Sequence, residues 1–111
     1  MSTFDPLQIQ WREPWEPIEP DYAPIAEKEL HRELCISHVL FGRSVKAIGN
    51  RTDSDDILFY LGDEAPQFAV VHLTFKSESN PAWPHTSLYD SLAAWVEQCM
   101  IPEAEEWTRV E

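Results

Sequence analysis

The chain has 111 residues, which is the size of one domain. Its 20 acidic and 8 basic residues leave a formal charge of −12, and such a field repels the phosphate backbone of nucleic acids. No apolar run approaches the ~20 residues of a membrane-spanning helix. The first residues show no basic segment followed by an apolar core, so no signal peptide is predicted. Composition therefore argues against nucleic-acid and membrane partners, and it predicts a cytoplasmic protein that could attract a basic protein partner.

Residues 1–24 differ in composition from the rest and form a predicted proline- and tryptophan-rich arm. Leu7, Ile9 and Trp11 alternate with glutamines, a pattern typical of an edge strand. Prolines then recur at positions 14, 17 and 20, and a polyproline II helix with about three residues per turn would gather Trp15 and Ile18 on one edge. That edge could strap onto its own domain, an interpretation favoured because Trp and Ile suit a free linker poorly. It could instead bind a partner, or join a homodimer through the arm.

The predicted core domain covers residues 25–102 and begins with a helix. Pro24 suits a helix start, and Ala26, Leu30 and Leu34 recur every four residues, so a helix is expected from residue 25 to about residue 36. A first strand is predicted at 43–48, followed by a polar loop at 49–56.

A β-hairpin is expected at the centre of the domain. Its strands are the β-rich runs 57–61 and 68–75, and the turn residues Gly62 to Pro66 lie between them. The second run is apolar on both parities, which is typical of a strand covered on both faces. His72 and Thr74 then make one face polar.

A second helix is expected near the C-terminus. Pro81 and Pro84 keep residues 76–85 irregular, and Thr86 or Ser87 would cap a helix that runs to about Met100. Pro102 is expected to end it, which leaves residues 103–111 as an acidic tail. The predicted fold is α+β: a three- to four-stranded antiparallel meander packed against two helices in the order α-β-β-β-α, preceded by the proline-rich arm.

The candidate catalytic chemistry centres on His72. Thr74 shares its strand face, Tyr60 lies on the neighbouring predicted strand, and His85 follows in the next loop. A histidine at such a strand end could be the general base of a small hydrolase. The favoured alternative is a core histidine that bonds a backbone carbonyl, because no second carboxylate or nucleophile is tied to it by spacing. Trp83, in the same loop, would either plug the sheet edge or anchor a partner.

A metal site is conceivable at His31, Cys35 and His38, which are spaced four and three residues apart. They could bind zinc on one helix face if the helix reached His38. The helix is expected to end earlier, which favours a buried cysteine beside surface histidines. Cys99 is likewise predicted to pack rather than react. No phosphate-binding glycine loop or nucleophile elbow is present, so no cofactor is expected.

Residues 38–100 resemble a group of small bacterial proteins of unassigned function. The likeness is carried by short segments of the predicted strands, loops and second helix: residues 41–42, 46–49, 55–59, 69–75, 83–86 and 89–100. The resemblance implies no activity or cofactor, and the arm lies outside it.

The sequence thus predicts a non-enzymatic protein-binding module of inhibitor or immunity type. Strong acidity, the arm and the lack of a complete catalytic set favour it, with Trp15, Ile18 and Trp83 as candidate anchors. The alternative is a small hydrolase-like or metal-binding protein with its site at His72.

Overall fold

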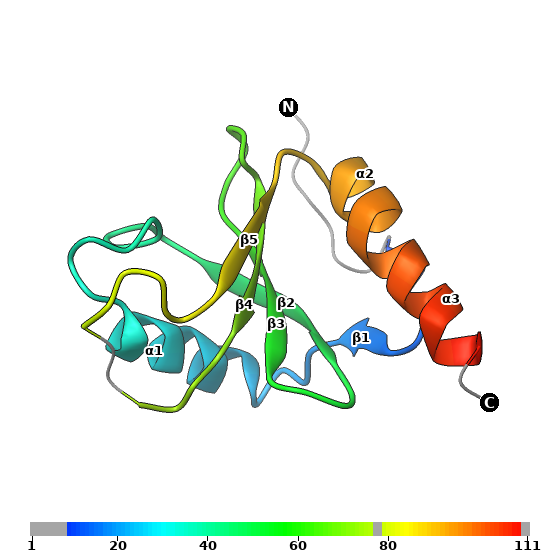
Figure 1. Ribbon diagram of the computed structural model, residues 1–111, viewed down its shortest axis with the longest axis horizontal. Helices are drawn as coiled ribbons and strands as arrows, with labels where there is room; N and C mark the ends of the chain where they lie inside the picture. The colour runs from blue at the N-terminus through cyan, green and yellow to red at the C-terminus, as the bar shows by residue number, and fades with distance from the viewer. Residues whose placement is uncertain (1–8, 77–78, 110–111) are drawn as a thin grey trace.

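The computed structural model describes residues 9–76 and 79–109. Five strands form one antiparallel sheet in chain order (Figure 1). The elements are β1 (Trp15–Pro17), α1 (Ala23–Glu33), β2 (Lys46–Arg51), β3 (Asp56–Tyr60), β4 (Phe68–His72), β5 (Thr86–Tyr89), α2 (Leu92–Trp95), the π-helical turn η2 (Val96–Met100) and α3 (Ile101–Arg109). The last three join into one C-terminal helix. The α+β class is confirmed, with two more strands than the minimal meander predicted.

The central hairpin lies where the sequence predicts it, except that its second strand ends at His72 and not at Phe75. β3 and β4 pair antiparallel, from Asp56 opposite His72 to Tyr60 opposite Phe68. On one face, Ile57 and Phe59 pack in a cluster with α1. On the other face, Leu58 and Phe68 pack against the C-terminal helix. The two middle strands are therefore covered on both faces, as the apolar pattern indicates.

The first strand starts and ends three residues later than predicted. β2 runs from Lys46 to Arg51 and carries a register shift between Ala47 and Gly49. Glu27 of α1 accepts a hydrogen bond from the Ala47 amide at 2.8 Å, which ties the helix to this irregularity. The Trp11 ring lies so close to Gly49 that a Cβ atom there would overlap it, so this position requires glycine.

The predicted arm is part of the domain. β1 pairs with β2, placing Trp15 opposite Arg51. Because side chains alternate along a strand, Trp15 is buried on the C-terminal-helix face while Ile18 packs with the α1 cluster. The prediction that one edge of a polyproline II helix carries both residues is therefore wrong. Leu7 lies outside the described residues, and Ile9 and Trp11 belong to no strand.

The C-terminal helix begins later and ends later than predicted. Thr86–Tyr89 is strand β5, paired with β4, and the Ser91 hydroxyl caps the helix by accepting from the Ala94 amide at 3.1 Å. Pro102 does not stop the helix. The π-turn before it, where the Ile101 amide bonds the Val96 carbonyl, is a wider turn of the kind that accommodates an interrupted ladder. Residues 103–109, predicted as a tail, are helical.

No helix within the described residues is long and apolar enough to cross a membrane.

Candidate functional site

His72 lies at the end of β4, where its ring contacts a carboxylate. Its Nδ1 is 2.9 Å from Oδ1 of Asp56, the residue directly opposite on β3. An ionised carboxylate only accepts, so Nδ1 carries the proton in this contact. The His72 side chain is 50% exposed and that of Asp56 is 27% exposed. The prediction of a core histidine at this position is therefore wrong, and the sequence prediction missed the Asp56 carboxylate that lies beside His72.

The other predicted members of the His72 site lie elsewhere or contact it only through the backbone. Tyr60 pairs with Phe68, four residues along β3 from Asp56 and so about 13 Å away, and its hydroxyl bonds Asp63. That bond raises the pKa of Tyr60. The His85 carbonyl accepts from the His72 amide at 3.1 Å, while the His85 side chain is exposed.

Thr74 is bound to a different partner. Its amide and its hydroxyl both donate to Oε1 of Glu33, at 2.8 and 3.1 Å. The predicted cluster of His72, Thr74 and Tyr60 is therefore not assembled.

The predicted metal triad is not assembled either. α1 ends at Glu33, so Cys35 and His38 lie beyond the helix that was to align them with His31. In the part of the chain that the structure describes, no group of three or more histidine, cysteine or acidic side chains could hold a metal ion.

His38 is buried and uses both ring nitrogens. Nδ1 accepts from the Leu40 amide at 3.0 Å, so the proton lies on Nε2, which is 3.0 Å from the Pro84 carbonyl. The Thr86 hydroxyl lies 3.3 Å from the same Nε2. His38 thus has the structural role that was predicted for His72. The prediction that His38 lies at the surface is wrong. His38 joins the loop after α1 to the loop before β5.

Glu33 makes a second connection of the same kind. This buried carboxylate accepts from the amides of Thr74 and Phe75, at 2.8 and 2.7 Å. Burial, followed by a hydrogen bond with Glu29, raises the pKa of Glu33 and outweighs the donors that would lower it. Phe75 has φ of 61°, a left-handed backbone conformation that is uncommon for a non-glycine residue. Glu33 therefore holds the loop after β4 against the end of α1.

The loops that these two connections hold also carry a group of exposed apolar side chains. We call the group the loop surface; it comprises Ile36 (81% exposed), Val39 (57%), Phe41 (49%), Phe75 (48%) and Trp83 (45%). Its members lie on a first loop (residues 34–45) and on the described parts of a second loop (residues 73–76 and 79–85). His38 of the first loop contacts Pro84 of the second near one end of α1 (Figure 1). Only two other large hydrophobic residues in the described ranges are comparably exposed, Ile25 and Leu88. Of this group, sequence reasoning found only Trp83.

The other predicted anchors are less accessible. Trp15 is 1% exposed, and its indole nitrogen donates to Glu103 at 2.8 Å, so it cannot anchor a partner in this conformation. Ile18 is partly buried against the α1 cluster.

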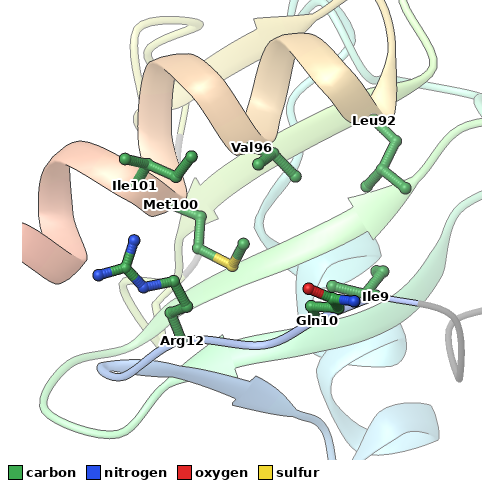
Figure 2. Close-up of a pocket in the computed structure, with 7 residues that line it drawn as sticks. All are labelled: Ile9, Gln10, Arg12, Leu92, Val96, Met100 and Ile101. Carbon is green, nitrogen blue, oxygen red and sulfur yellow. The ribbon is translucent and has the colours of Figure 1, made fainter.

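A cleft of ≈ 250 Å³ separates the segment before β1 from the C-terminal helix. Figure 2 shows its lining, which is mostly apolar. Arg12 is the one charged residue among those that line it, so the cleft offers no pair of titratable groups for acid–base chemistry.

Cys99 is an unsuitable nucleophile. Burial, followed by the nearby charge of Glu103, raises the pKa of its thiol to about 12. Since the thiolate is the reactive form, this thiol is unreactive near neutral pH. The predicted packing role therefore fits the structure.

No family model, curated protein or solved structure matches this chain.

Proposed function

We propose that the protein is a non-enzymatic protein-binding module and that it binds another protein chain through the loop surface. The observation that carries the proposal is that five of the seven exposed large hydrophobic residues in the described ranges lie on these two loops. Exposed apolar side chains concentrated in one part of a protein commonly mark an interaction site. One member, Trp83, is a large side chain of the kind that anchors interfaces.

The base of this surface is fixed before any partner arrives. His38 bonds the second loop through the Pro84 carbonyl, and Glu33 bonds it through the amides of Thr74 and Phe75. Turn hydrogen bonds from the amides of Phe41 and Arg43 order the first loop. A surface already held in its bound shape loses less conformational entropy on association.

The enzyme alternative has weaker support. A histidine–carboxylate pair does exist at His72 and Asp56, but Tyr60 and Thr74 are engaged by Asp63 and Glu33. A general base also needs a substrate site within hydrogen-bond reach. The cleft of Figure 2 is lined by none of these residues.

If the partner is a different, basic protein, this chain would act as an inhibitor or immunity-type protein. Nineteen of the 20 acidic residues lie outside the two loops, and their field would speed the approach of such a partner.

Photo-crosslinking inside the native cell tests the proposal. A photoreactive phenylalanine analogue replaces Trp83 in one variant and Ile25 in a control, because Ile25 is an exposed apolar residue at the other end of α1. We expect covalent adducts with a second protein chain from position 83 and none from position 25. Equal adducts from both positions, or none from position 83, would overturn the proposal.

A further inference from the structure

We propose that the cleft between residues 9–12 and the C-terminal helix binds a small aliphatic carboxylate, whose head group contacts Arg12 and whose chain lies along the helix. The lining of the cleft includes Ile9 and Met100, which belong to the buried cluster under the C-terminal helix. No residue of the loop surface lines it. The inference therefore goes beyond the proposed function and does not depend on it.

One wall of the cleft is an apolar row on the C-terminal helix. Leu92, Val96 and Met100 are spaced four residues apart, and Figure 2 shows their side chains pointing toward the opposite wall, where Ile9 lies. At a rise of about 1.5 Å per residue, this row extends over about 12 Å. An elongated apolar lining suits an alkyl chain, because binding removes apolar surface of both partners from water.

Both walls are held in place by contacts within the chain. Trp11 lies between two residues of the opposite wall, and its ring meets the Trp95 ring of the helix edge to face, with the centroids 6.0 Å apart. The Arg12 carbonyl accepts a hydrogen bond from the Trp15 amide at 2.9 Å. The cleft therefore exists before a ligand arrives, which lowers the entropic cost of binding.

Arg12 supplies the charge that selects the ligand. It lies at one end of the cleft, beside Met100 and Ile101, and is the one charged residue of the lining (Figure 2). Within the described residues, Arg32 and Arg51 pair with carboxylates, whereas the Arg12 side chain forms no ion pair or hydrogen bond. A guanidinium can bind a carboxylate through two parallel hydrogen bonds. An amine would meet a like charge there, and an alcohol would lack the ionic contact.

The net charge and the volume narrow the ligand further. The charge of −12 opposes anions at long range, but exposed charges are largely screened beyond about 8 Å at physiological ionic strength, so the direct contact with Arg12 decides the local interaction. The cleft of ≈ 250 Å³ is smaller than the roughly 300–1,000 Å³ of sites that enclose drug-sized ligands. It therefore fits one short alkyl chain and excludes a two-chain phospholipid.

Two-dimensional NMR of the isotope-labelled full chain tests the inference, with sodium octanoate as the probe. We expect saturable shifts of the amide signals of Gln10, Val96 and Ile101, and little change in the first loop. The matched probes are 1-octanol and octylammonium, which carry the same chain with a neutral or a cationic head group. Both should bind at least about tenfold more weakly than octanoate.

Substitutions separate the head group from the chain. Arg12→Gln should weaken octanoate binding at least about tenfold and leave octanol binding unchanged. Arg32→Gln is the control, because it removes the same charge on α1, where Arg32 is paired with Glu29; it should bind octanoate like the wild type. Val96→Phe fills the cleft at a half-buried position and should weaken both octanoate and octanol. Circular dichroism shows that each variant is folded.

The outcomes that overturn the inference are distinct from those that concern the loop surface. An absence of saturable shifts up to roughly 10 mM octanoate overturns the site. Equal affinities for octanoate and octanol, or octanoate binding that Arg12→Gln leaves unchanged, overturn the carboxylate as ligand. Shifts centred away from the cleft overturn its location. None of these results bears on the proposed function, which crosslinking from position 83 tests.

Discussion

The two faces of the sheet are covered by different types of side chain. The cluster under α1 is almost wholly aliphatic, with Phe59 as its one aromatic residue among eleven buried members. The cluster under the C-terminal helix contains Trp15, Trp95 and Phe68, and Trp11 packs at its edge. The rings of Trp15 and Trp95 meet edge to face at 5.3 Å. A few large rings thus join β1, the sheet and the C-terminal helix on one face. On the other face, many small aliphatic contacts join α1 to the sheet.

Polar groups also differ between the faces. At the end of the α1 face, Glu33 and His38 bond backbone amides and a carbonyl of the loops. On the tryptophan face, Glu103 bonds two other side chains, the indole of Trp15 and the guanidinium of Arg51, each at 2.8 Å. The first arrangement fixes the shape of the loops that carry the proposed binding surface. The second joins secondary-structure elements to one another.

The largest expected effect is on the tryptophan face. Trp95→Ala removes a fully buried ring, and we expect the free energy of unfolding to fall by about 3–5 kcal/mol in urea denaturation. The control is Trp83→Ala, which deletes the same side chain where it is 45% exposed and should cost below about 1 kcal/mol. Similar losses for both variants would contradict the dominance of the buried rings.

The α1 face is tested next through Glu33→Gln. The amide can still accept from Thr74, but its NH₂ group would face the Phe75 amide, so we expect a loss of about 2 kcal/mol. Glu106→Gln, on the exposed side of α3, is the control and should change little.

The same variant gives a pH dependence of known sign. Because the pKa of Glu33 is raised above its ordinary value of 4.5, the folded state binds the proton more tightly than the unfolded state. Its contribution to stability is fully present below pH 4.5 and declines as the pH rises through the folded-state pKa. Glutamine does not titrate. The stability advantage of the wild type over Glu33→Gln should therefore be largest at low pH; an advantage that grows with pH would refute the raised pKa.

The sequence predicted the middle of this fold better than its margins. The predicted runs 57–61 and 68–75 carry strong β patterns around a clear turn, so the pairing and two-sided burial of residues 57–60 and 68–71 followed from local chemistry. A hydroxyl before an apolar stripe is typical of a helix cap, so the sequence predicts a helix that Thr86 or Ser87 would cap. Pairing with β4 decides otherwise, and this contact is remote in sequence. Helix continuation past Pro102 required a π-turn that no local pattern indicates.

The candidate site was harder to predict for the same reason. Whether Ile36, Val39 and Phe41 are core or surface depends on how the loop after α1 folds, and the local spacing of apolar residues does not determine this. The role of His38 depends on Pro84, 46 residues away. The contact between Asp56 and His72 is the one side-chain pair that could have been predicted from the sequence. Counting equal numbers of residues outward from the hairpin turn places the two opposite each other.

A smaller effect separates the two contacts of His38. His38→Asn retains an acceptor near the Leu40 amide but loses the donor to the Pro84 carbonyl, so we expect a loss of about 1 kcal/mol. Hydrogen exchange should become faster in residues 79–85 while the Leu40 amide stays protected. Uniform acceleration across both loops would show instead that the histidine does not act as a local connection.

The smallest effect is expected at the open end of the tryptophan face, where the His72–Asp56 pair lies in partial contact with water. Exposed ion pairs typically contribute about 0.2–1 kcal/mol, so a double-mutant cycle of His72→Ala and Asp56→Asn should give a coupling in that range. The cycle sharpens the contrast with His38, whose ring is buried and bonded on both sides. A coupling above about 2 kcal/mol would mean that this pair, like Glu33, holds the backbone around it. Polar contacts that hold the backbone would then occur on the tryptophan face as well as on the α1 face, and the contrast between the two faces would fail.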